Sequence, residues 1–183
     1  MFRTRLMRSV LVTLATVVAI VATLVSVPAR ASAANQVPFR ATLTETAPMA
    51  AFCPTNQTQY LCVTVLGTGH ATHLGAITES AVVRVDTSSG AGPGMAGCAS
   101  EVRTSTLTAA NGDQITLQGP GQACGPPVGI ATAADSWAVS AGSGRFAGAT
   151  GSGTNSVTIT RPPPPTLVTS VTIFSGTISS PGR

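Results

Sequence analysis

Two histidines three positions apart are the first residues whose types could do chemistry. His70 and His73 are the two histidines of the chain, and imidazole is a common metal ligand and general base. On a strand, side chains three positions apart point to opposite faces, so this pair cannot hold one metal ion unless the strand bends. No second carboxylate–histidine cluster supports a metal site. We therefore interpret both histidines as structural, and we predict no metal site and no cofactor.

A nucleophilic triad is the next chemistry to consider. It needs a serine or cysteine beside a histidine with an acid behind it. Serines are plentiful, but the Gly-x-Ser-x-Gly pattern of a nucleophile elbow does not occur, and Gly151-Ser152-Gly153 lacks its spacing. Hydrolase activity is therefore disfavoured, and we predict no catalytic residue.

Glu101 and Arg103 are an acid and a base that share one face of an expected strand with Leu107. If that face lined the interior of the protein, the pair would lie in apolar surroundings, where pKa values shift. Because buried charge is costly, we instead expect a solvated pair at the rim, which contributes little stability. We expect Trp137 and Phe146 to fill the core rather than to contact a ligand.

The glycine-rich stretch GSGRFAGATGSG, over residues 142–153, could cradle a phosphate, act as a linker or form a turn. A phosphate loop needs a helix after the glycines, and here a strand pattern follows at Ser156–Thr160. A linker would not carry a large apolar residue such as Phe146 in its middle. We predict a chain reversal whose aromatic ring caps a hydrophobic interior.

The first 34 residues have the parts of an export signal. Arg3, Arg5 and Arg8 form a positive start, Val10–Val27 is an apolar run, and small residues follow over 29–34. An uncleaved membrane anchor is the alternative, because these 18 apolar-leaning residues are at the lower limit for a span. The small-residue site that follows directly favours cleavage. We predict a signal peptide over 1–34, a single domain over 35–183 and a secreted protein.

Removal of this segment leaves a neutral domain. All ten basic residues are arginines, and four of them lie in the first 34 residues, so six arginines remain against six acidic residues. A neutral domain lacks the clustered cations that nucleic acid requires and the basic patch that anionic lipid attracts. We predict neither nucleic acid nor a membrane as a partner of the mature protein.

The remaining chain of about 150 residues is long enough for one core, and its sequence pattern predicts β-structure. Thr, Val, Ser and Gly dominate it, and no window holds a helical period. Short β-branched runs alternate with turn residues, which predicts eight or nine strands and is typical of sandwiches and barrels. The expected strands lie at 37–45, 60–66, 72–77, 81–85, 101–109, 114–118, 136–140, 156–160 and 168–178.

The four cysteines, Cys53, Cys62, Cys98 and Cys124, all lie in the exported part. An even number in an oxidising compartment favours disulfides, and the spacings do not resemble a zinc site. In TLTAANGDQITL, a three-residue loop over 110–112 with Gly112 in the left-handed region pairs Leu107 with Ile115. Extending this register brings Cys98 opposite Cys124. We predict that pair as one disulfide, and Cys53–Cys62 as the other.

Three ordered motifs together resemble a known group of proteins. They are GTGHATHLG at 67–75, LTAANGD at 107–113 and GSGRFAGATG at 142–151. The combination resembles bacterial secreted proteins of the allene oxide cyclase-like barrel superfamily, of which plant dirigent proteins are more distant members. The resemblance implies an eight-stranded antiparallel barrel that assembles as a trimer in the plant relatives. It carries over no reactive residue.

Two classes of function follow from this reading. The first is a non-enzymatic barrel that binds or confines a small apolar molecule, or that has a structural role outside the cell. The second is a cyclase-like or dirigent-like isomerase whose cavity restricts a reactive intermediate. A cavity with convergent polar groups would favour ligand capture or chemistry, whereas an interior filled by side chains would favour a structural role.

Overall fold

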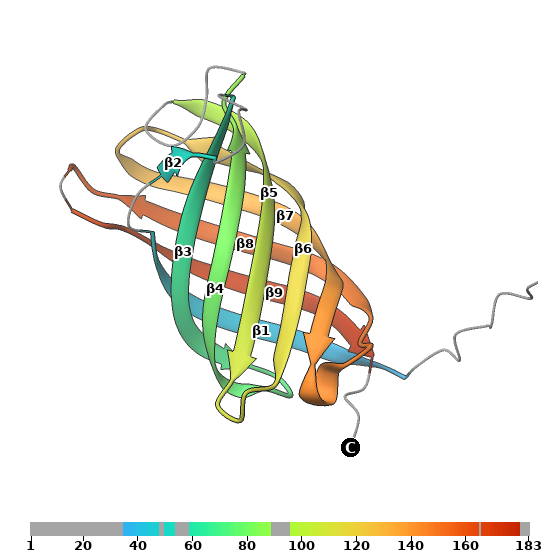
Figure 1. Cartoon of the computed structure of the whole chain (residues 1–183). Coiled ribbons are helices and arrows are strands. Elements are labelled where there is room, and N and C mark those ends of the chain that lie inside the picture. Colours follow the sequence, from blue (N-terminus) through green and yellow to red (C-terminus); the bar gives the residue numbers. More distant parts are fainter. Residues whose placement is uncertain (1–34, 48–49, 54–58, 89–95, 165, 180–183) are drawn as a thin grey trace, which may run out of the picture. The chain divides into compact units, whose positions relative to one another are not determined.

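A computed structural model of the chain describes residues 35–47, 50–53, 59–88, 96–164 and 166–179. These residues form an all-β fold with one short helical turn (Figure 1). The strands are β1 (Gln36–Ala47), β2 (Ala50–Phe52), β3 (Tyr60–Ala71), β4 (Gly75–Asp86), β5 (Gly97–Ala109), β6 (Gln114–Gly125), β7 (Gly129–Ser143), β8 (Gly151–Arg161) and β9 (Val168–Ser179). The helical turn is η1 (Gly144–Phe146).

Eight of the strands close into an antiparallel barrel. From β3 to β9 each strand pairs with the next along the chain, and β1 pairs with β9 on one side and β3 on the other. The short strand β2 pairs with residues 61–63 of β3, and β1 pairs with residues 66–71 of the same strand. Closure pairs both sides of the long strands, which meets the need of a strand-rich chain to hide its edges. The predicted all-β, eight-stranded antiparallel barrel is confirmed.

Side chains alternate between the interior and the outer wall. On β5, the residues from Glu101 to Ala109 at odd positions are buried, and the residues between them are partly exposed. The outward positions of the barrel carry many Thr and Ser, whose β-branched or small side chains suit a pleated surface. An eight-stranded barrel is just wide enough for its interior to be filled by side chains.

The sequence GTG at 67–69 lies inside β3 and is not the turn that its glycines suggested. The turn falls at 72–74, where His73 has φ 68° and Gly75 has φ 74°. The two expected strands at 72–77 and 81–85 are therefore a single strand, β4. Gly69 is needed for space, because a Cβ there would lie 2.0 Å from the carbonyl oxygen of Thr42. A glycine in a strand can thus mark close backbone approach instead of a reversal.

One end of the barrel, here called the Phe146 end, is closed by the glycine-rich stretch. η1 connects β7 to β8, and the Phe146 side chain is fully buried. A Cβ on Gly142 would lie 2.1 Å from the carbonyl oxygen of Phe146, so the chain can fold over this point only with glycine there. The predicted reversal with an aromatic cap is confirmed. Trp137 is buried in the same apolar cluster, as expected for a core residue.

The opposite end, here called the disulfide end, carries both disulfides. The β5–β6 register pairs Leu107 with Ile115 and Cys98 with Cys124, and the latter two form a disulfide. Gly112 has φ 86° in the connecting loop, as the three-residue turn requires. The second disulfide joins Cys53 to Cys62. Both predicted pairings are confirmed.

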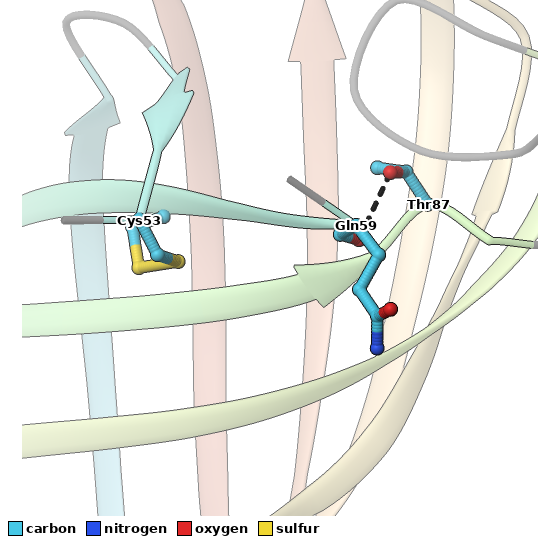
Figure 2. The surroundings of a disulfide bond; sticks show 4 residues. Cys53, Gln59 and Thr87 are labelled. Carbon is cyan, nitrogen blue, oxygen red and sulfur yellow. Dashed lines mark hydrogen bonds between the residues drawn. A yellow bond between two sulfur atoms is a disulfide. The ribbon is translucent and has the colours of Figure 1, made fainter. Parts of the chain in front are cut away.

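Hydrogen bonds fix the chain around Cys53–Cys62. The Cys53 amide donates to the Tyr60 carbonyl at 3.2 Å. Close by, the Thr87 hydroxyl donates to the Gln59 carbonyl at 2.9 Å, which ties the end of β4 to the start of β3 (Figure 2). The disulfide thus closes a short loop onto an already paired part of the sheet.

We expect the double variant Cys53→Ser/Cys62→Ser to fold with a free energy of unfolding lower by about 2–3 kcal/mol, because a disulfide across nine residues restricts the unfolded chain modestly. Urea denaturation of the purified variant measures the loss. A loss below about 0.5 kcal/mol would show that the unfolded chain is not restricted by this bond.

The interior has three zones along the barrel axis. A large apolar cluster fills the Phe146 end, and it includes Phe39, Leu107, Trp137 and Phe174. A smaller cluster of valines and alanines lies toward the disulfide end: Val65, Ala81, Val83, Val85 and Ala99. Between the two apolar clusters lies a zone of buried polar residues.

Candidate functional site

The zone between the apolar clusters is the candidate site, and we call it the polar belt. Its members point inward from six strands and are all less than one-tenth exposed. They are Glu45 on β1, Glu79 on β4, Glu101, Arg103 and Ser105 on β5, Asp135 on β7, Asn155 on β8 and Thr172 on β9. Buried ionisable residues in such number are rare unless they are paired or functional.

Arg103 is the centre of an ion-pair network across the barrel. Its Nη2 donates to Glu45 Oε1 at 2.5 Å and to Glu79 Oε1 at 2.8 Å. Its Nε donates to Ser105 Oγ at 2.8 Å. The Ser170 hydroxyl donates to the other oxygen of Glu45 at 2.7 Å. The network links β1, β4, β5 and β9 through side chains alone.

The expectation of a solvated Glu101–Arg103 pair at the rim is wrong. Arg103 is 5 % exposed and Glu101 is 7 % exposed, and both lie inside the barrel. Burial is tolerated for Arg103 because partners from two other strands compensate its charge. Those partners, Glu45 and Glu79, are far from it in sequence, so the local pattern could not reveal them.

Glycine makes room for two carboxyl groups to meet. Gly121 on β6 lies between Glu101 on β5 and Asp135 on β7 in the strand register. A Cβ on Gly121 would lie 1.7 Å from Asp135 Oδ1, so the Asp135 carboxyl group lies directly over this glycine. Glu101 and Asp135 are thereby neighbours across the missing side chain.

The two carboxyl groups that bind Arg103 differ in acidity. Burial opposes ionisation of Glu45, but the charge of Arg103 and the hydroxyl of Ser170 outweigh it and hold the pKa of Glu45 below its usual value. For Glu79, burial and the repulsion from Glu45 outweigh Arg103 and raise the pKa to about 7. Glu45 is therefore the permanent counter-ion of Arg103, and Glu79 titrates near neutral pH.

The Glu101–Asp135 pair holds a proton at neutral pH. Burial and the neighbouring Asp135 raise the pKa of Glu101 to about 8. Burial also raises the pKa of Asp135, although the contact with Glu101 works against this shift. Two adjacent carboxyl groups cannot both ionise cheaply, so they share one proton over a wide pH range.

Several polar atoms of the belt have no hydrogen-bond partner among the described residues. They are Glu79 Oε2, both carboxylate oxygens of Asp135, both amide atoms of Asn155 and the Thr172 hydroxyl. An unpaired buried polar atom costs about 1–3 kcal/mol, and native proteins contain few. Six of them in one zone make the belt the place where ordered water or a bound molecule would find partners.

A narrow gap between side chains lies beside Asp135 and Asn155. With the side chains as they stand, it has no room for a free water molecule. Its lining includes Arg103, Asp135, Trp137, Asn155 and Phe174. Polar groups thus converge on aromatic rings, but a ligand must displace side chains to enter.

The histidines lie outside this site. His70 is on the outer face of β3, and His73 lies in the following turn, where its Nε2 is 3.0 Å from the Pro38 carbonyl oxygen. Within the part of the chain that the structure describes, no group of three His, Cys, Asp or Glu residues could hold a metal ion. That part of the chain also contains no helix long and apolar enough to cross a membrane.

Most of the belt was missed at the level of sequence. Glu45 had a usable signal, since it continues the inward face of Phe39, Ala41 and Leu43 by one more alternation. Asp135 and Asn155 lie opposite one another on β7 and β8, but each is one residue before an expected strand rather than inside it. The pairing of β7 with β8 brings these two positions together.

The comparisons with known proteins identify no relative. No protein-family model, no curated protein and no solved structure matches the chain. The class that fold and site define is a closed antiparallel barrel with a buried polar belt and two disulfides, and the disulfides are consistent with an extracellular location.

Proposed function

We propose that this chain is an exported binding protein whose barrel confines a small molecule, with the polar part of the ligand at the belt. The proposal rests mainly on the buried polar atoms of Glu79, Asp135, Asn155 and Thr172 that have no hydrogen-bond partner among the described residues. A purely structural barrel gains nothing from leaving such atoms unpaired, because apolar side chains of similar size would be as stable or more so.

The two halves of the interior assign an orientation to the ligand. Phenylalanines and Trp137 fill the Phe146 end. Toward the disulfide end the inward side chains are small, and those of β7 are Ala131 and Ala133. An apolar portion of the ligand fits this half better, because it displaces less side-chain volume here than it would at the Phe146 end. The ligand enters from the disulfide end.

The disulfides and the sequence motifs support the same proposal. The disulfides suit an oxidising compartment, and residues 1–34 have the pattern of a cleaved signal peptide. Membership of the allene oxide cyclase-like superfamily, with a homotrimer as its assembly, is part of this proposal and rests on the sequence motifs.

Native mass spectrometry of protein purified from the medium of its own host tests the proposal. We expect a bound mass that is released on denaturation, and the same spectrum gives the oligomeric state. Ala133→Leu, which points into the barrel, should lose the bound mass, because an added side chain competes for the space. Ala134→Leu on the outer face should keep it. A spectrum of empty protein would favour the structural role instead.

A cyclase-like or dirigent-like isomerase is the second candidate. The observation that favours it is the proton held between Glu101 and Asp135, because groups that titrate near neutral pH suit acid–base catalysis. In that case chromatography of the released small molecule should resolve two isomers of one mass, whereas Glu101→Gln protein should release one isomer only.

A further inference from the structure

The polar belt has a chemical preference that narrows the ligand class. Resting on the proposed function, we propose that the pocket at Asp135 and Asn155 binds the primary ammonium group of a small organic cation. The argument uses the balance of charges, the kinds of unpaired atoms and the rings that line the pocket.

The charges of the belt are unbalanced. Four carboxyl groups, those of Glu45, Glu79, Glu101 and Asp135, face the single guanidinium of Arg103 among the belt residues. Glu45 and one oxygen of Glu79 are bound to that guanidinium. The remaining acidic groups have no cation of their own in the belt. Uncompensated buried charge is costly, and a bound cation removes that cost.

The unpaired atoms are mainly hydrogen-bond acceptors. Glu79 Oε2, the two oxygens of Asp135 and Asn155 Oδ1 accept, while the Thr172 hydroxyl can do both and Asn155 Nδ2 donates. A proton shared with Glu101 satisfies one oxygen of Asp135 and leaves the others. An ammonium group has three donors and no acceptor, which matches this surplus.

Asp135 and Asn155 lie side by side where they can contact a ligand in the pocket. They are 5 % and 3 % exposed, they pair across β7 and β8, and both line the pocket. Both side chains therefore reach the pocket from neighbouring strands. An ammonium group is about as large as a water molecule, so side chains at the pocket must move for it to bind.

Aromatic rings line the same pocket. The Trp137 ring is held by its Nε1, which donates to the Thr154 carbonyl at 3.0 Å, and by an edge contact with Phe39 at 5.6 Å between ring centroids. Phe174 lines the pocket beside it. Aromatic faces attract organic cations, so the apolar and polar walls favour the same head group.

Calorimetric titration of the secreted protein with n-butylammonium chloride and with 1-butanol tests the proposal. Both titrations are run at one ionic strength fixed with NaCl. We expect butylammonium to bind at least about tenfold more tightly than butanol, the gain of a hydrogen bond to a charged group. Equal binding of the two probes would overturn the ammonium proposal and leave small-molecule binding intact. Binding of neither would overturn both.

Two further readouts connect binding to the belt. Asp135→Asn should remove the preference for butylammonium, whereas Asp86→Asn, the same change on the outer side of β4, should keep it. A preference retained in Asp135→Asn would overturn the assignment. If Asp135→Asn does not fold, the pH dependence of the wild-type protein decides.

The affinity for butylammonium should change with pH in one direction only. The charged groups that act on Asp135 are Glu45 from β1 and Glu101 and Arg103 from β5. Arg161, at the end of β8, acts on Glu101. Because Glu79 and Glu101 lose protons between pH 6 and pH 9, butylammonium should bind more tightly at pH 9, while butanol should not change. Weaker butylammonium binding at pH 9 would overturn the proposal.

Discussion

Arg103→Met should lower the free energy of unfolding by about 3–5 kcal/mol, the largest effect expected of a single substitution in the belt. The variant leaves Glu45 and Glu79 buried, adjacent and without the cation that both bind at present. Methionine matches much of the arginine stem, so lost packing contributes little. Urea denaturation followed by Trp137 fluorescence measures the change.

Matched variants separate lost charge compensation from a general effect of the substitution. Arg40→Met, on the outer face of β1, should change stability by no more than about 0.5 kcal/mol. Adding Glu45→Gln and Glu79→Gln to Arg103→Met should recover much of the loss, because no buried charge then lacks a partner. A loss below about 1 kcal/mol for Arg103→Met would contradict the buried network.

The folded protein should be less stable at pH 9 than at pH 5. The pKa of Glu79 is raised to about 7 and that of Glu101 to about 8, against 4.5 for an ordinary glutamate. Between these values the folded protein holds protons that the unfolded chain has released, so stability falls as pH rises. At about 1.4 kcal/mol per pKa unit, Glu79 over about two units and Glu101 over about three should together lower the free energy of unfolding by at most about 7 kcal/mol between pH 5 and pH 9.

Urea denaturation at pH 5, 7 and 9 measures this decline. Glu45 has a lowered pKa, so its stabilising contribution is lost only as pH falls below 5 and does not mask the trend. In the double variant Glu79→Gln/Glu101→Gln, stability should be nearly flat over this range. A wild-type stability that is constant or rises toward pH 9 would place these carboxyl groups in water.

The architecture was predictable where local patterns determine it. Hydrophobic register in one hairpin was enough to pair Leu107 with Ile115, and the same ladder carried through to the Cys98–Cys124 disulfide. Phe146 could be assigned to a cap because a large apolar residue among glycines has few other uses. Each of these inferences needed only neighbours in the chain or one turn.

The candidate site was not predictable in the same way. Arg103 is buried because Glu45 and Glu79 approach it across the closed barrel, at sequence separations of 58 and 24. The ladder from β5 through β6 to β7 brings Asp135 next to Glu101 over Gly121. Seen locally, charged residues on a strand belong at the rim, and that preference is usually correct. Sites where such a local rule fails are often functional.

A high-resolution crystal structure of the secreted protein at neutral pH tests the central claim most directly. The account predicts density for a small molecule or organic cation in contact with the Asp135 carboxylate and the Asn155 amide, inside a barrel where Arg103 binds Glu45 and Glu79. Density for water alone at these atoms, or side chains rearranged so that each is paired within the protein, would contradict it.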